Sequence, residues 1–160
     1  MNNPQQHTVS EILLRARRAS RWLARKKTPA QIDEMLVEMS RTVEANIPAI
    51  LRHNAEDLAA MAPDDPMRDR LALTEERILA ITADMRAVAS LPSPLGKTLL
   101  SIQRPNGLSI KKVSVPFGVI GVIYEARPNV TFDVFSLCIK AGSSVVLKGG
   151  HAASSTNTFV

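Results

Sequence analysis

The sequence predicts an α/β protein in which N-terminal helices precede a β-hairpin arm and one strand–helix–strand unit of a parallel sheet. Two observations support this prediction. The first is an asymmetry of composition: all seven glycines, five of the six aromatic residues and nine of the thirteen valines follow residue 95. The second is hydrophobic spacing, which changes from a period of three to four residues to short β-branched runs. The chain therefore divides into a helical first part and a second part that contains the strands.

Composition narrows the class of protein. The 160 residues are 45% apolar, which excludes a disordered chain, and no apolar run approaches the roughly 20 residues of a membrane helix. A single cysteine, Cys138, excludes an internal disulfide framework and a multi-cysteine metal site. His7, His53 and His151 lie too far apart in sequence to suggest a metal site. Residues 1–6 are polar and no apolar core follows them, so we expect a soluble, cytoplasmic protein.

Capping residues and prolines mark the helices expected in residues 1–95. Thr8 and Glu11 have the spacing of a capping box, and Thr28 followed by Pro29 repeats the start signal. Pro48 should interrupt the second helix, because a helix interior cannot accommodate the proline ring. The predicted helices run over 9–26, from 29 through 43, from about 46 through 58, and from 74 to 91 at the latest.

The net charge of +5 arises entirely after residue 95, where seven basic residues face two acidic ones. Before that point the 13 basic and 13 acidic residues balance. Residues 15–27 nevertheless hold seven basic groups and no acid, a pattern found in organelle transit helices and nucleic-acid-binding arms. We favour a solvated helix face, because apolar residues at helical spacing share the same segment.

A β-hairpin is predicted between residues 99 and 113. Strand-like runs at 99–103 and 109–113 flank Asn106-Gly107, and Asn-Gly is a strong hairpin signal because both central residues of a type I′ turn need positive φ. Pro105 makes a slightly longer loop equally compatible. The alternation of lysine, serine and apolar residues in the second strand indicates an arm that is only partly buried.

A strand–helix–strand unit follows. Residues 119–124 are apolar on both faces, as expected for a central parallel strand covered by helices on two sides. Helical spacing over 131–140 ends at Gly142, and 144–148 forms the next strand. Such a unit should have a right-handed crossover.

Parallel sheets bind ligands at the carboxyl ends of their strands, where two segments of this chain meet. The first is 125–129. In the second, 148–155, Gly149 and Gly150 leave backbone N–H groups open to an anion and Lys148 contributes a charge. The segment lacks the Gly-Lys-Ser/Thr of a phosphate loop, and taken alone it is more typical of a tight turn with a solvated lysine than of an anion site.

Residues 115–131, VPFGVIGVIYEARPNVT, closely resemble the gamma-glutamyl phosphate reductase family of the aldehyde dehydrogenase superfamily. Further stretches at 69–71, 73–78, 104–108 and 147–150 are similar to the same family. The resemblance implies an aldehyde dehydrogenase-like fold: residues 1–95 as the helical N-terminal part of a Rossmann-like cofactor domain, 96–117 as the hairpin arm, and 118–160 as the start of the parallel-sheet NADP-binding core. The catalytic domain would be absent, so we expect an N-terminal fragment of a longer enzyme.

The resemblance also implies a reaction, the NADPH-dependent reduction of L-glutamyl 5-phosphate to L-glutamate 5-semialdehyde and phosphate in proline biosynthesis. In the family a cysteine thiolate attacks the acyl phosphate. Cys138 lies in an apolar helical context with no nearby group to lower its pKa, so we expect the nucleophile beyond residue 160 and an inactive fragment.

Site residues follow from the same resemblance. Lys148 matches the superfamily lysine at a strand end that contacts the adenosine ribose. Asn129 is similar in place to the asparagine that donates to the developing oxyanion. Arg127 is a candidate substrate-binding residue. The expected cofactor-binding residues are Tyr124, Glu125, Lys148, Gly149 and Gly150.

The resemblance also implies partners: a small-molecule substrate, further copies of the chain in a homo-oligomer assembled through the hairpin arm, and a functional contact with glutamate 5-kinase. It implies no binding to nucleic acid or to a membrane. Two alternatives remain beside the enzyme hypothesis. One is a non-catalytic nucleotide- or anion-binding module built on the same strand–helix–strand unit. The other is a basic nucleic-acid-binding protein, although the second half lacks the aromatic and basic platform on which single strands stack.

Overall fold

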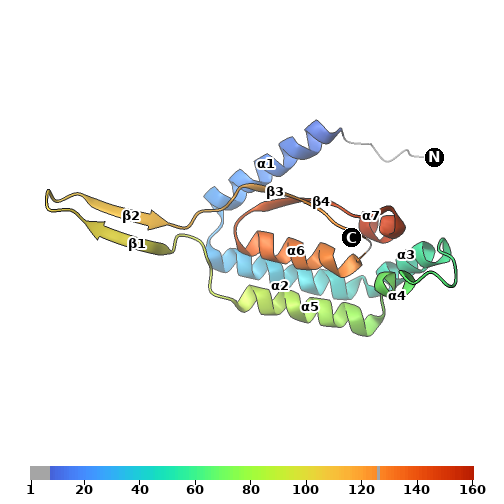
Figure 1. The fold of residues 1–160 in the computed structure, drawn as a ribbon. Helices are drawn as coiled ribbons and strands as arrows, with labels where there is room; N and C mark the ends of the chain where they lie inside the picture. The colour runs from blue at the N-terminus through green and yellow to red at the C-terminus, as the bar shows by residue number, and fades with distance from the viewer. Residues whose placement is uncertain (1–7, 126) are drawn as a thin grey trace.

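A computed structural model describes residues 8–125 and 127–160. His7 and Ala126, the latter within the stretch that carries the family resemblance, lie outside the described residues. The elements in chain order are α1 (Val9–Lys26), α2 (Pro29–Ala45), α3 (Ile47–Ala59), α4 (Arg68–Leu71), α5 (Glu75–Ser90), β1 (Thr98–Gln103), β2 (Ser109–Val113), β3 (Val119–Ile123), α6 (Pro128–Lys140), β4 (Ser144–Lys148), the 3₁₀ turn η1 (His151–Ala153) and α7 (Ser154–Phe159). The predicted order of helices, hairpin and strand–helix–strand unit is confirmed (Figure 1).

The predicted helix starts are confirmed at the level of individual hydrogen bonds. The Thr8 hydroxyl accepts the backbone N–H of Glu11 while the Glu11 carboxylate accepts the N–H of Thr8, and Thr28 and Gln31 form the same reciprocal pair. The side chain of Thr74 caps α5. No described helix combines the length and the apolar character needed to cross a membrane.

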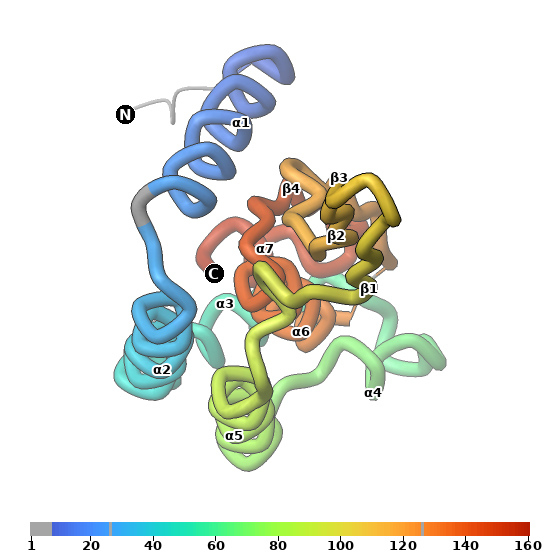
Figure 2. The backbone as a smooth tube through the Cα atoms, turned by 90° about the vertical axis from the view of Figure 1, so that its left-hand side faces the viewer, coloured from blue at the N-terminus to red at the C-terminus, as the bar shows by residue number. Residues whose placement is uncertain are grey.

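The core lies between α2, α5 and α6, which run side by side beneath the small sheet (Figures 1 and 2). One buried apolar cluster joins α2, α3, α5 and α6 and includes Ile50, Ile78 and Phe132. A second buried apolar cluster joins α1 to α2, α5 and α6 and includes Leu23, Leu36 and Ile139. Burial of this kind contributes about 1.5–3 kcal/mol per large apolar side chain.

Lys140 is a buried charge in this helical layer, and its side chain is only 4% exposed. Its ammonium group donates to the Asp33 carboxylate of α2 and, at 2.7 Å, to the carbonyl oxygen of Ala89 in α5. In the structure this charge ties the end of α6 to both neighbouring helices.

β3 and β4 pair in parallel with Val119 opposite Ser144 and Ile123 opposite Lys148. Helix α1 covers one face of this sheet and α6 the other (Figures 1 and 2). The predicted covering by helices is confirmed, but the predicted burial of β3 is wrong: Ile123 is 86% exposed. The reason is that each strand has a single neighbour among the described residues, so two strands do not make the interior of a sheet.

The hairpin of β1 and β2 projects from the rest of the molecule (Figure 1). The strands are antiparallel with Ile102 opposite Ile110, and the connection is the longer of the two predicted loops, spanning 104–108. Gly107 supplies the positive φ of +84° that the turn requires. Every residue of both strands is exposed, but Ile102 and Ile110 keep only 37% and 44% of their surface accessible, so the arm is partly covered, as we expected.

Candidate functional site

The two predicted ligand segments meet at the carboxyl ends of β3 and β4. The backbone N–H of Tyr124 donates to the carbonyl oxygen of Lys148 at 3.1 Å, which extends the parallel pairing by one residue. Glu125 and the Lys148 side chain are exposed at this edge, and the Lys148 ammonium group donates to the carbonyl oxygen of Gly149 at 3.0 Å. The structure therefore brings these residues together as the strand order predicted.

The side chain of Tyr124 belongs to a polar cluster that the sequence did not reveal. Its hydroxyl lies 2.5 Å from the Thr131 hydroxyl of α6. Both hydroxyls approach the Asn157 side-chain oxygen of α7, Thr131 at 3.2 Å and Tyr124 at 3.4 Å. The Asn157 amide nitrogen is buried without a hydrogen-bond partner. We call Tyr124, Thr131 and Asn157 the tyrosine cluster. It lines a cavity of about 230 Å³ whose other walls are mostly apolar.

Gly149 is required by close packing against this cluster. A Cβ atom at this position would lie 2.3 Å from the Asn157 amide nitrogen and 3.2 Å from the Tyr124 hydroxyl. The sequence suggested that the two glycines leave backbone N–H groups open to an anion. The structure adds a second reason for the first of them, because no side chain fits between Gly149 and α7.

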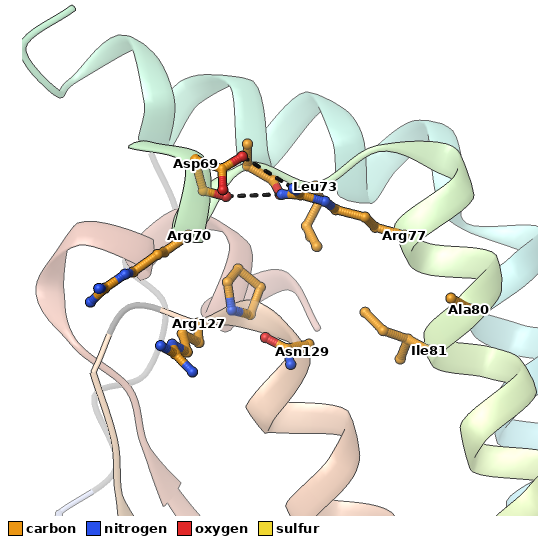
Figure 3. Close-up of a pocket in the computed structure, with 10 residues that line it drawn as sticks. Asp69, Arg70, Leu73, Arg77, Ala80, Ile81, Arg127 and Asn129 are labelled. Atoms are coloured by element: carbon orange, nitrogen blue, oxygen red, sulfur yellow. Dashed lines mark hydrogen bonds and ion pairs between the residues drawn. The ribbon is translucent and has the colours of Figure 1, made fainter. Parts of the chain in front are cut away.

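A second cavity, of about 360 Å³, lies between α4, α5 and the N-terminus of α6 (Figure 3). Arg127 and Asn129 line it, together with Asp69, Arg70 and Arg77. We call this cavity the arginine pocket. The predicted site residues are thus divided between two places: Tyr124 and Gly149 line the first cavity, whereas Arg127 and Asn129 line the second.

One side of the arginine pocket is fixed by Arg77. Its guanidinium donates to the Asp69 carboxylate at 3.1 Å and to the carbonyl oxygens of Asp69 and Ala72 at 2.9 and 2.7 Å. These bonds hold the short helix α4 against the start of α5. Residues 69–78 carried part of the family resemblance, but nothing in the local sequence indicated that they lie beside Arg127.

The N-terminus of α6 forms the opposite side. Arg127 precedes the helix in extended conformation without a side-chain cap, and Pro128 occupies the first turn. The Asn129 side-chain amide donates to the Asp133 carboxylate at 3.4 Å, a long contact for a hydrogen bond. Burial, with a smaller contribution from the nearby Asp84, raises the pKa of Asp133 above its usual value. The exposed Asn129 amide therefore keeps donor capacity for another acceptor.

The segment after β4 is anchored from α3. The Asp57 carboxylate accepts the N–H groups of Ser155 and Thr156, both at 2.8 Å, and the Thr156 hydroxyl at 2.7 Å. The Ser155 hydroxyl donates to Glu56 at 2.6 Å and thereby holds the pKa of that carboxyl below its usual value. The side chain that caps α7 is Asp57, which no local signal marks because it lies about a hundred residues earlier.

Cys138 behaves as the sequence predicted. Its side chain is 7% exposed, and burial raises the pKa of its thiol. A low thiolate fraction and a buried sulfur are the opposite of what a nucleophile needs. Among residues 8–125 and 127–160, no three histidine, cysteine or acidic side chains come together in a way that could hold a metal ion.

Comparison with known proteins identifies relatives along nearly the whole chain. The chain is 49% identical over 155 residues to the gamma-glutamyl phosphate reductase of Chlorobium limicola, covering 97% of this chain and 37% of that protein. It is 52% identical over 152 residues to that of Phocaeicola vulgatus, covering 95% and 36%. The chain thus spans little more than a third of the length of the curated relatives it matches. No family model matches it.

Solved structures give the same result. The crystal structure of gamma-glutamyl phosphate reductase from Saccharomyces cerevisiae superposes with a TM-score of 0.86 at 28% identity, covering 96% of this chain and 40% of that one. A probable aldehyde dehydrogenase from Listeria monocytogenes superposes with a TM-score of 0.65 at 16% identity, covering 92% and 30%. This second match concerns the fold alone. The predicted resemblance to the family and the predicted fold class are both confirmed.

Proposed function

We propose, on the premise that this chain is homologous to the gamma-glutamyl phosphate reductases, that it forms the cofactor-binding part of an enzyme that reduces L-glutamyl 5-phosphate. The products would be L-glutamate 5-semialdehyde and phosphate, in the synthesis of proline. The observation that carries the proposal is the meeting of 124–125 and 148–150 at the carboxyl ends of two parallel strands, within a chain about half identical to curated reductases.

The edge of β3 and β4 is the proposed NADPH site. Lys148, exposed at this edge, supplies a positive charge suited to the ribose and its 2′-phosphate. Gly149 and Gly150 allow a ligand to approach the backbone, and Glu125 is exposed beside them. The Tyr124 side chain is engaged by Thr131 and Asn157, so its proposed contribution is to hold the site in shape. Bound NADPH would supply the hydride that reduces the acyl group.

Asn129 and Arg127 are the proposed substrate residues. The Asn129 amide would donate to the oxygen that gains negative charge during reaction, a contribution of roughly 3–4 kcal/mol for such donors. Arg127, exposed at the same pocket, would contact an anionic part of the substrate. Buried Cys138 does not suit the role of nucleophile, so we place the reactive cysteine in a catalytic domain outside these 160 residues. The chain by itself would then be inactive.

The remaining proposals concern organisation. We divide the chain into a helical part (1–95), an arm (96–117) and the start of the NADP-binding core (118–160). The exposed arm suits pairing between subunits of a homo-oligomer, because its apolar residues Leu99, Leu100 and Ile110 stay 44–55% exposed. A functional contact with glutamate 5-kinase and a cytoplasmic location accord with a biosynthetic role.

NADPH titration tests the cofactor proposal. We expect saturable binding to the 160-residue chain and a loss of at least about fivefold in affinity in Lys148→Ala, as for the removal of one charge-assisted contact. Lys111→Ala is the matched control, because it removes the same charge from the exposed arm. Equal affinities in wild type and Lys148→Ala would refute the role of Lys148. If the chain binds NADPH saturably but contributes nothing to turnover by a longer reductase, the alternative hypothesis of a non-catalytic nucleotide-binding module would be favoured.

A further inference from the structure

The arginine pocket has an unbalanced charge. Three guanidinium groups and one carboxylate line it, those of Arg70, Arg77, Arg127 and Asp69. Arg77 and Asp69 form an ion pair at 3.1 Å, and the Arg77 guanidinium also donates hydrogen bonds to two backbone carbonyl oxygens. The charges of this pair cancel, and its hydrogen bonds hold α4 against α5. The excess positive charge of the arginine pocket therefore comes from Arg70 and Arg127.

Neither of these two arginines is paired with a carboxylate among the described residues. Among the described residues, the Arg70 guanidinium donates only to the sulfur of Met67, at 3.7 Å, and a thioether sulfur is a weak acceptor. Arg70 extends from α4 and Arg127 from the segment before α6, so two elements that are distant in sequence supply them. Figure 3 shows both side chains on the side of the pocket away from Ala80 and Ile81.

We propose that Arg70 and Arg127 together bind a phosphoryl group, and that Arg70 is thus a substrate-binding residue alongside Arg127. This inference rests on the proposed function and specifies which part of the substrate the pocket holds. Two unpaired guanidinium groups match a phosphoryl charge of about −1.5 to −2 at neutral pH, whereas a carboxylate would balance only one of them. The planar forks of both side chains also suit bidentate contact with phosphoryl oxygens.

Asn129 supports the choice of an acyl phosphate. Its amide lines the same pocket as the two arginines. An acyl phosphate carries a carbonyl oxygen directly beside its phosphoryl group, so one small ligand can offer an acceptor to Asn129 and an anion to the arginines at the same time. A volume of about 360 Å³ is within the range of small-molecule sites.

The test measures inorganic phosphate binding to the chain by calorimetry or by amide chemical shifts at constant ionic strength. We expect saturable binding that weakens about tenfold in Arg70→Gln and in Arg127→Gln, and changes less than twofold in Arg104→Gln. Arg104 lies in the exposed loop of the hairpin, so that variant removes the same charge elsewhere. Arg70 is exposed and makes few contacts, so the variant should retain the wild-type far-UV circular dichroism.

Equal phosphate affinities in all three variants, or no saturable binding in wild type, would overturn the proposal. L-glutamate is the second probe, because it offers two carboxylates and no phosphoryl group. Binding of L-glutamate as tight as that of phosphate, with the same dependence on Arg70, would assign the pocket to a carboxylate instead and refute the phosphoryl assignment. NADPH affinity, measured in parallel, should be unchanged in Arg70→Gln, so failure of the phosphate site and failure of the cofactor proposal give different results.

Discussion

The anchoring of α7 by Asp57 gives the sharpest prediction about stability. Thr156 is fully buried, and both its backbone N–H and its hydroxyl donate to the Asp57 carboxylate. Replacing Asp57 by alanine leaves both of these donors without an acceptor. The N–H of Ser155 loses its acceptor as well, but this residue is half-buried and can be hydrated. Two buried groups without partners, at about 1–3 kcal/mol each, give an expected loss of about 2–6 kcal/mol.

Urea unfolding followed by far-UV circular dichroism measures this loss, and amide hydrogen exchange at Thr156 reports whether α7 detaches before the rest of the chain unfolds. Asp57→Asn keeps one acceptor oxygen and should lose about half as much. Asp64→Asn, in the exposed loop after α3, is the control. A loss below about 0.5 kcal/mol in Asp57→Ala, with Thr156 protection unchanged, would contradict the assigned cap.

Two further predictions concern packing and pH. Gly149→Ala should push the Asn157 amide out of the tyrosine cluster and lower both the stability of the chain and its affinity for NADPH. Gly121→Ala is the control and should leave NADPH affinity unchanged, because its added Cβ has no neighbour within 4 Å. Urea unfolding and NADPH titration measure both effects, and equal effects of the two substitutions would refute the packing role of Gly149. Hydrogen bonds from Thr82 and Arg86 hold the pKa of Glu44 below its ordinary value of 4.5, so the stability that Glu44 contributes is complete above about pH 4.5 and is lost as the pH falls through the lowered value. Unfolding midpoints of wild type and Glu44→Gln should therefore converge as the pH falls below about 4.5, and a gap that does not narrow on acidification would contradict this assignment.

Local signals in the sequence predicted most of the fold. The capping boxes at Thr8 and Thr28 predicted the helix starts because both partners lie within one turn. Asn106-Gly107 predicted the hairpin, and two β-branched runs around a helix predicted a parallel pair. In each case the determining groups are close in sequence. The start of α6 was predicted three residues late, since Pro128 can occupy the first turn of a helix as well as precede one.

The candidate sites depend on contacts that the sequence does not display. The division of the predicted residues between two cavities arises because Arg127 faces α4 and α5 while Tyr124 faces α7. Asp57 and Asn157 were missed because each bonds to a partner dozens of residues away, and Arg70 because the pocket that it lines with Arg127 forms only in the folded chain. The stretch at 69–78 resembled the family before any contact was known, and this was the one signal that could have pointed to Arg70.

The open edge of β3 has a consequence for the isolated chain. Each strand of the parallel pair has one neighbour among the described residues, and Phe117 and Ile123 next to this edge are 91% and 86% exposed. Unpaired strand edges with apolar neighbours are templates for strands from other molecules. The modest net charge of +5 provides little electrostatic repulsion against such contacts. Aggregation in concentrated solutions of this chain should therefore begin by strand addition at β3, while the packed helices α2, α5 and α6 remain intact.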